Sequence, residues 1–258
     1  MALVQLASIC GLIILVYMSL LFIVALIRRD NSIADIGWGI GFIVVALSVM
    51  LIQSDFSSRQ ILLTVLVALW GFRLAGRILK RNWGKGEDFR YRKWREEWGR
   101  WFLLRSYLQV FLLQGFFMWL NSLPVIITGA HAQSGLGWLD YAGLAVWLTG
   151  FFFEAVGDWQ LDRFLADRSN RGKILDTGLW RYTRHPNYFG EVVMWWGIFV
   201  ISLSQPWSWI GIIGPVTITV LILFISGVPM LERSMASNPG FKEYARKTSV
   251  FVPLPPHR

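Results

Sequence analysis

Cysteine is almost absent from this chain of 258 residues, and its absence excludes several kinds of site. The single cysteine, Cys10, lies inside the first apolar run. One thiol cannot build a disulfide framework or a zinc cluster, and a thiol in an apolar run is no obvious nucleophile. We therefore expect no metal site, and the cysteine content leaves the redox compartment open.

Other patterns are missing as well. The chain has no Gly-x-Gly-x-x-Gly element, so a Rossmann domain is not expected. The polar pieces between the apolar runs show no β-type alternation. There is also no internal repeat, low-complexity tract or soluble second domain. These absences favour one membrane domain over residues 1–258.

Long apolar runs are what the chain has in abundance. Hydrophobic residues make up 55% of it, Trp occurs 15 times, and the mean hydropathy is +0.48. A soluble globule lacks the polar surface to cover so many apolar side chains, whereas roughly 20 apolar residues span a bilayer as a helix. We expect an all-α integral membrane protein with about seven transmembrane helices. The expected spans are Val4–Ile27, Ile36–Ile52, Ile61–Leu79, Ser106–Ala130, Leu136–Trp159, Gly190–Leu203 and Trp207–Val228.

The distribution of positive charge predicts how these spans are oriented. The net charge is +9, and alternating the spans places 23 of the 25 Lys and Arg on one face. Lys and Arg collect in cytoplasmic loops, so we expect the N-terminus outside and the C-terminus inside the cell. We expect a multi-pass protein of the bacterial inner membrane, in contact with membrane lipids, with no nucleic-acid partner and no obligate protein partner. The basic segment Lys80–Arg105, rich in Trp, is a candidate for an interfacial amphipathic helix.

Charged residues inside the spans are costly and need a reason. Arg73 lies six residues before the end of the third expected span. It is too deep to reach water easily, so we expect it to face a polar cavity or an acidic partner. Asp35 and Asp158 lie nearer to span ends, where contact with water is the simpler explanation.

The densest group of polar residues lies in 154–258. Glu154, Asp158 and Asp162 are spaced at i, i+4 and i+8, which places three acids along one helix face. A salt-bridge mesh and a ligand site explain this acidic stripe equally well, since many Arg and Lys follow within one loop. Further on, Gly178 and Pro186 break regular structure, and a helix then starts near Asn187. Its free N–H groups suit a phosphate or carboxylate, although a simple capped helix entry is the alternative.

The segment Arg184-His-Pro-Asn-Tyr-Phe-Gly-Glu191, followed by Trp195 and Gly197, resembles the C-terminal signature of the steroid 5α-reductase family. Sterol reductases of the same clan carry a similar Arg-His-Pro-Asn-Tyr segment. The resemblance is clearest over residues 154–197, looser over the tail 241–253, and weak in the N-terminal half. It points to a bacterial membrane member of this family.

The resemblance implies an NADPH pocket that opens to the cytoplasm. A dinucleotide with a 2′-phosphate needs several cations, and its ribose and amide groups need carboxylates or amides, which agrees with the residues present. The residues expected to bind the cofactor are Glu154, Asp158, Arg163, Arg168, Arg171, Lys173, Arg181, Tyr182, Arg184, His185, Asn187, Tyr188, Glu191, Trp195, Arg233 and Tyr244.

The resemblance also implies a reaction, the reduction of a carbon–carbon double bond conjugated to a ketone in a steroid-like or other lipid substrate. The carbonyl oxygen then needs a donor, which in the family is a tyrosine paired with an acidic residue. This chain has Trp70 at the matching position, and an indole cannot supply a proton. We expect Asp35, Trp70 and Arg73 to bind substrate. Asp35, Arg73 and Tyr91 are the expected catalytic residues, with Tyr91 as a substitute donor.

Two other functions remain open. Membrane methyltransferases that act on isoprenylated cysteine carry a similar Arg-His-Pro-x-Tyr stretch and bind S-adenosylmethionine. That cofactor has no phosphate, so the basic loop before Arg184 favours a dinucleotide. A transporter or a non-catalytic membrane component would use the intramembrane charges as a path. Against it, the chain lacks an inverted repeat, and its polar residues collect at the expected cytoplasmic ends of the spans.

Overall fold

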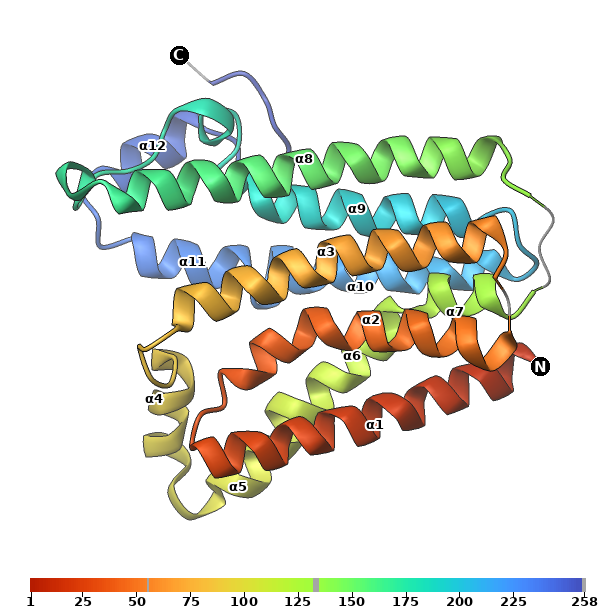
Figure 1. Cartoon of the computed structure of the whole chain (residues 1–258). Helices are drawn as coiled ribbons and strands as arrows, with labels where there is room; N and C mark the ends of the chain where they lie inside the picture. The colour runs from red at the N-terminus through yellow and green to blue at the C-terminus, as the bar shows by residue number, and fades with distance from the viewer. Residues whose placement is uncertain (55, 132–134, 257–258) are drawn as a thin grey trace. The chain divides into compact units, whose positions relative to one another are not determined.

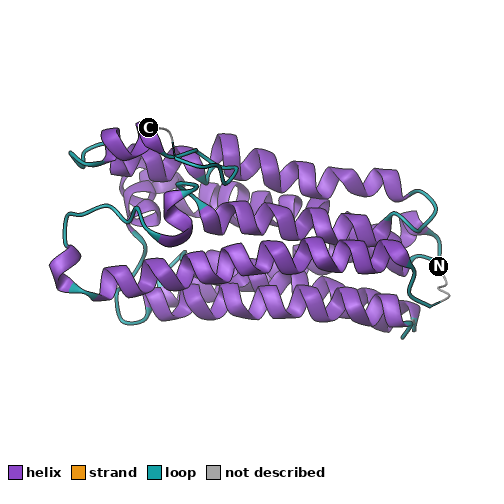
Figure 2. Ribbon diagram, turned by 90° about the horizontal axis from the view of Figure 1, so that it is seen from above, coloured by secondary structure: helices purple, strands orange, loops and turns teal. Residues whose placement is uncertain are grey.

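The computed structural model describes residues 1–54, 56–131 and 135–256, and these residues form helices joined by short loops (Figures 1 and 2). Within them no strand forms, and the β-type pairing is an isolated bridge between Thr183 and Ser249. The chain divides into two compact units, which are described in turn. Unit 1 comprises Met1–Gly137 and Ser202–Gly214, and unit 2 comprises Trp138–Ile201 and Pro215–Arg258.

Unit 1 begins with three long helices, α1 (Leu3–Arg28), α2 (Ile33–Gln53) and α3 (Ser58–Asn82). The middle helix, α2, packs against both others (Figure 1). The chain continues through α4 (Phe89–Trp98), a 3-10 turn (Gly99–Trp101), α5 (Phe102–Arg105), a π-helical stretch (Ser106–Leu112), α6 (Leu113–Asn121) and α7 (Leu123–Gly129). A 3-10 segment, Ser208–Ile212, also belongs to unit 1 and packs against α7.

Unit 2 is built on the long helix α8 (Trp138–Ala166) and on α9 (Pro186–Ser202), with two 3-10 turns between them, Arg168–Asn170 and Gly178–Arg181. Most of α10 (Ile213–Val220) follows, then a π-helical stretch (Leu221–Ile225), α11 (Val228–Met235) and α12 (Phe241–Lys247). The helix start expected near Asn187 is confirmed. The first helical residue is Pro186, at the position where proline suits a helix best.

Six helical segments among the described residues are long and apolar enough to cross a membrane: Leu3–Arg28, Ile33–Gln53, Ser58–Asn82, Phe89–Asn121, Trp138–Ala166 and Ser208–Met235. Together with α9, of 17 residues, they correspond to the seven predicted spans. The α1 helix exposes Val4 (76%), Leu12 (59%) and Ile27 (77%), as expected of side chains that face lipid. The all-helical membrane fold is confirmed, whereas its orientation stays a prediction.

The boundaries differ from prediction between the third and fourth spans. The third helix runs to Asn82, and the basic segment after it forms the separate helix α4 from Phe89 to Trp98. Asp88 caps α4, because its side chain accepts a hydrogen bond from the N–H of Arg90 at 3.0 Å. The predicted span Ser106–Ala130 is interrupted at Ser122, between α6 and α7.

Glycines allow helices to pack with their backbones in contact. In unit 1, a Cβ atom on Gly71 would lie 2.5 Å from the carbonyl oxygen of Gly39, so α2 and α3 meet with no side chain between them. In unit 2, α8 carries glycines at 143, 150 and 157, and these lie against Gly197, Gly190 and Pro186 of α9. Lipid gives helices no hydrophobic reason to associate, so close van der Waals packing at small residues must supply the attraction.

This packing predicts opposite outcomes for two glycines of α3. The Gly71→Ala substitution forces the new methyl group into the backbone of α2, and we expect it to cost about 1–3 kcal/mol of stability. Gly76→Ala meets no atom within 4 Å, and it gains up to about 1 kcal/mol of helix propensity. Unfolding midpoints of both variants in detergent test this. Equal destabilisation by the two substitutions would show that helix contact at Gly71 does not limit stability.

Candidate functional site

The loop that leads into α9 is fastened to α8 by side chains. Gln160 of α8 accepts a hydrogen bond from the N–H of Leu179 at 3.0 Å, and the indole N–H of Trp180 donates to the carbonyl of Gly157 at 3.0 Å. Gly178 begins this turn with a φ of 60°, a conformation that costs glycine little. The route of the chain toward the Arg184–Glu191 segment is therefore fixed by α8.

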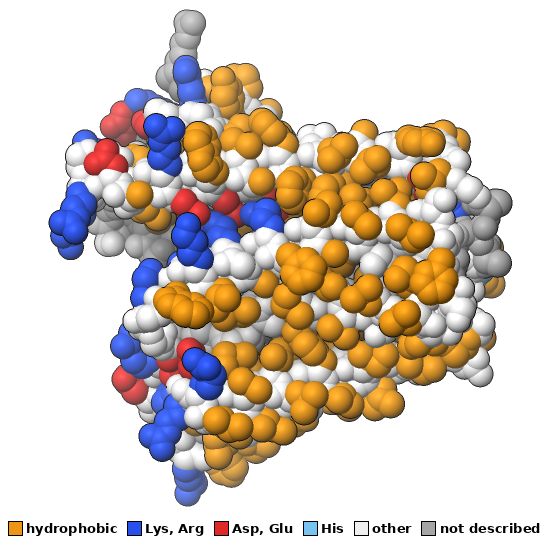
Figure 3. Space-filling model, in the orientation of Figure 1, with side chains coloured by type: hydrophobic (Ala, Val, Ile, Leu, Met, Phe, Trp, Pro, Cys, Tyr) orange, Lys and Arg blue, Asp and Glu red, His pale blue; other side chains and the backbone are white. Residues whose placement is uncertain are grey.

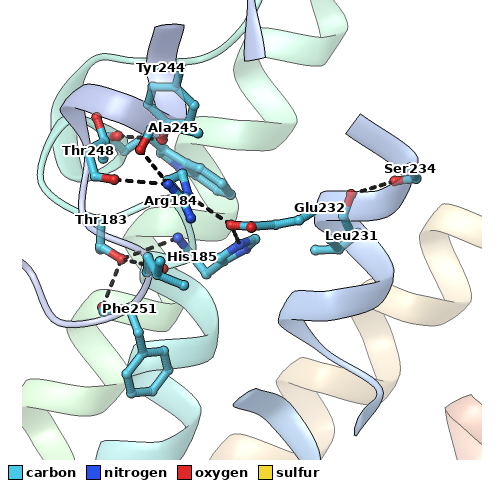
Figure 4. A network of polar contacts seen from close by, with 12 residues as sticks. Thr183, Arg184, His185, Leu231, Glu232, Ser234, Tyr244, Ala245, Thr248 and Phe251 are labelled. Carbon is cyan, nitrogen blue, oxygen red and sulfur yellow. Dashed lines mark hydrogen bonds and ion pairs between the residues drawn. The ribbon is translucent and has the colours of Figure 1, made fainter. Parts of the chain in front are cut away.

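Arg184 and His185 converge on one carboxylate, that of Glu232 in α11 (Figure 4). The Nε of Arg184 lies 2.8 Å and the Nε2 of His185 lies 3.1 Å from the same oxygen, Oε1. Arg184 also donates to the carbonyl oxygens of Ala245 (2.7 Å) and Thr248 (3.2 Å) at the end of α12. The guanidinium is 8% exposed, so its charge is satisfied by protein groups.

The C-terminal tail lies along the same loop. Thr183 donates through its hydroxyl to the carbonyl of Phe251 at 2.8 Å (Figure 4). The N–H of Leu254 donates to the carbonyl of Tyr182 at 3.0 Å. The hydroxyl of Tyr244 in α12 donates to the carbonyl of Trp180 at 2.6 Å. Tyr244 and Arg184, both expected to bind cofactor, thus hold the tail and the loop together.

The acidic stripe of α8 lies partly in the interior of unit 2. Glu154 and Asp158 are 3% and 4% exposed, whereas Asp162 is exposed near the end of the helix. Asp158 accepts a hydrogen bond from the side-chain N–H of Asn187 at 3.1 Å. This contact brings together the two motifs that the sequence singled out. The oxygen of the same Asn187 amide, Oδ1, is buried and has no hydrogen-bond partner among the described residues.

The predicted cofactor-binding cations at the end of α8 and in the following loop are exposed to solvent. The exposed members of this set are Arg163, Arg168, Arg171, Lys173 and Arg181. They follow the stripe at the C-terminal end of α8 and in the loop that leads to α9. This part of unit 2 therefore carries positive charge on its exposed residues. Its buried residues are two acids and an amide oxygen that can accept hydrogen bonds.

The remaining predicted residues of unit 2 fall into two groups. Tyr188 stacks on the His185 ring with 5.7 Å between centroids, and Trp195 is buried at 1% exposure, so both take part in packing. Glu191 is half-buried one helical turn after Asn187, and Tyr182 and Arg233 are exposed. Glu191 therefore extends the face of α9 that begins with Asn187.

Unit 1 brings together two of the three predicted catalytic residues. The hydroxyl of Tyr91 in α4 donates to Oδ1 of Asp35 in α2 at 2.6 Å. Arg90 donates to the other oxygen, Oδ2, also at 2.6 Å. Tyr91 is 3% exposed, and the side chain of Asp35 is 15% exposed. A tyrosine and a carboxylate from an early helix therefore form a pair in this protein, with Arg90 as counter-ion.

Trp70 and Arg73 lie in α3. Trp70 is 2% exposed and packs edge-on against Phe42 of α2, with ring centroids 5.4 Å apart. Trp38 in turn lies edge-on against Phe42 at 5.0 Å. Arg73 is half-buried one turn after Trp70. Trp70, predicted to bind substrate, therefore takes part in the packing of α3 against α2.

Sequence reasoning missed Glu232, Gln160 and Arg90. Glu232 carries a weak signal, because it is the first acid after the last long apolar run. Gln160 and Arg90 carry none, since an exposed surface position would explain either residue as well. The rotation of a helix about its axis decides which of its side chains face the site. That rotation depends on contacts with residues far away in the sequence.

Comparison with known proteins places the chain in a family. The model of the family described as "Protein of unknown function (DUF1295)" matches residues 21–248. The chain belongs to the DUF1295 family.

Named relatives of this DUF1295 protein match it less completely. An uncharacterized protein of Schizosaccharomyces pombe is 23% identical over 228 residues, which cover 76% of this chain and 64% of that protein. Two proteins named steroid 5-alpha-reductase DET2, from Arabidopsis thaliana and Gossypium hirsutum, are 34% and 32% identical over 76 and 74 residues, and each match covers 29% of this chain and 27% of the plant protein. The chain thus spans less than two thirds of these relatives. No solved structure matches it.

The contacts of His185 predict a pH dependence of stability. Burial lowers the pKa of His185 below its ordinary value of 6.5, an effect that Glu232 only partly offsets and that Arg184 reinforces. The unfolded chain therefore takes up a proton on His185 at a higher pH than the folded chain does. The contribution of neutral His185 to the free energy of unfolding is fully present above about pH 6.5, and it is lost as the pH falls below that value.

Unfolding midpoints in detergent between pH 8 and 5 measure this effect, with the His185→Gln variant as the comparison. We expect the acid-side loss of stability to be smaller in the variant, since glutamine does not titrate. The same decline in both proteins would assign the pH dependence to other groups.

Proposed function

We propose that this DUF1295 protein is an NADPH-dependent reductase of a carbon–carbon double bond conjugated to a ketone, in a steroid-like or other lipid substrate. The observation that carries the proposal is the hydrogen bond between Asn187 and Asp158. It joins the Arg184–Glu191 segment to the acidic stripe in one polar cluster at the start of α9. The partial likeness to two proteins named as steroid 5α-reductases supports the type of reaction.

The residues present fit a phosphorylated dinucleotide. Its ribose hydroxyls need acceptors, and the Oδ1 of Asn187 is a buried acceptor with no partner among the described residues. Its phosphates need several cations, which Arg168, Arg171 and Lys173 supply from the exposed loop. S-adenosylmethionine has no phosphate and would leave these cations without a function. In this scheme Arg184 and His185 do not bind the cofactor directly, because Glu232 holds both side chains, and they instead position the start of α9.

The reaction adds a hydride to the β-carbon of the enone and a proton to its α-carbon, so that the double bond becomes single. Bound NADPH supplies the hydride. The chain must stabilise the negative charge that grows on the carbonyl oxygen, and it must supply the proton. The Tyr91 hydroxyl, held by Asp35 at 2.6 Å, is the group that we assign to these tasks. Arg90 beside Asp35 offsets the negative charge of the pair.

Cofactor choice tests the first half of the proposal. Purified protein in detergent is titrated with NADPH and, separately, with S-adenosylmethionine. We expect binding of NADPH alone and a loss of at least about tenfold in affinity for Asn187→Ala, because one or two hydrogen bonds to the cofactor disappear. Lys247→Gln is the control, since Lys247 is exposed and paired with Glu243 on α12. Tight binding of S-adenosylmethionine with no response to NADPH would end the proposal.

The donor assignment is tested by Tyr91→Phe in an NADPH oxidation assay with a panel of lipid enones. Removing a positioned acid lowers kcat by about 10²- to 10⁴-fold. We expect the affinity for NADPH to stay near that of the unmodified protein, since Tyr91 is not among the residues that we assign to the cofactor. Tyr107→Phe, which removes another unit 1 hydroxyl, paired with Ser19 at 2.9 Å, is the matched control. A fully active Tyr91→Phe variant would refute the assignment.

A further inference from the structure

The C-terminal end of α3 carries a surplus of positive charge. Residues 80–86 include three Lys or Arg and no acid. The acids that follow are already paired, Glu87 with Arg95 at 2.8 Å and Asp88 with Arg90 at 2.9 Å. Lys80 and Lys85 make no ion pair with any residue that the structure describes.

A hollow of about 500 Å³ opens on the same part of α3. Gly76, Leu79, Lys80 and Trp83 line it, and their spacing places them on one face of the helix. Gly76 leaves open space where another residue would place a side chain. The hollow therefore combines an apolar floor, an indole wall and a single amine.

Large aromatic side chains are exposed beside these cations. Trp83 is 76% exposed, and Phe89 and Trp101 are 65% and 52% exposed. In unit 1, hydrophobic side chains cover the length of the helices, and Lys and Arg gather at the end where α4 lies (Figure 3). Exposed rings next to cations at the end of a membrane helix are typical of the boundary between lipid tails and headgroups.

We propose that the face formed by Gly76, Leu79, Lys80, Trp83 and Lys85 binds an anionic phospholipid. Lys80 and Lys85 hold the phosphate group, and one acyl chain lies in the hollow along Leu79 and Trp83. A water-soluble anion would satisfy the two amines but not the exposed apolar floor and indole, and a zwitterionic lipid would leave the charge surplus uncompensated. The site is separate from the proposed reductase chemistry and does not depend on it.

Native mass spectrometry of the delipidated protein tests this lipid site. The protein is offered phosphatidylglycerol and phosphatidylcholine with the same acyl chains. We expect preferential retention of phosphatidylglycerol, and a loss of about thirtyfold in its affinity for the double variant Lys80→Gln/Lys85→Gln, since two interfacial charges disappear. Each single variant should show a loss of about fivefold. Trp83→Ala should weaken the binding of both lipids and leave the preference for phosphatidylglycerol unchanged.

The control is Lys93→Gln/Lys242→Gln, which removes the same charge from exposed lysines elsewhere. We expect it to retain phosphatidylglycerol as the unmodified protein does, and unfolding midpoints show whether each variant is folded. Equal retention of the two lipids, or an equal loss in the control, would overturn the proposal. Displacement of phosphatidylglycerol by an excess of inorganic phosphate or NADPH would also overturn it, because the site would then belong to a soluble anion.

Discussion

Glycines at 143, 150 and 157 let the backbone of α8 touch that of α9, and the polar cluster of unit 2 depends on this approach. A Cβ atom at Gly150 would lie 2.6 Å from the carbonyl oxygen of Gly190, so no other residue fits without separating the helices. One residue after Gly157 comes Asp158, and opposite it the α9 helix begins. The short distance between backbones is what lets a short carboxylate reach the Asn187 amide, and a wider separation would break this hydrogen bond.

Burial of the Arg184 guanidinium is the second constraint. A buried cation is tolerated only where acceptors surround it, and here Glu232 and the carbonyls of Ala245 and Thr248 supply them. These acceptors come from α11 and from the end of α12, so one side chain ties two separate segments to the entry of α9. Two motif residues, Arg184 and His185, are thus held by protein groups, whereas the buried Oδ1 of Asn187 has no hydrogen-bond partner among the described residues.

The sequence was sufficient to predict the helical membrane fold, because apolar runs of bilayer length leave few alternatives. It also predicted the helix start near Asn187 and singled out the acidic stripe, whose contact with Asn187 follows from the glycine-spaced packing of α8 on α9. It did not reveal Glu232 or Arg90 as partners. A partner across helices is selected by helix rotation, and a rotation of one residue changes which side chain faces inward. The sequence separated the third span from the basic segment but not at the right residues, since α3 continues to Asn82 and α4 begins only at Phe89, after the Gly84–Gly86 turn.

The position of Tyr91 has a consequence for the substrate. Trp70, the residue that the sequence resemblance matches to the tyrosine of the steroid 5α-reductase family, is 2% exposed and packs on Phe42, so this part of α3 is filled by indole. The Tyr91 hydroxyl reaches Asp35 from α4, a helix that the basic segment after α3 provides. Under the proposed reaction, the carbonyl group must therefore lie within hydrogen-bond reach of α4. The charges of Asp35 and Arg90 then set the polar end of the site, while the buried Trp70 indole fixes the packing of α3 on α2 behind it.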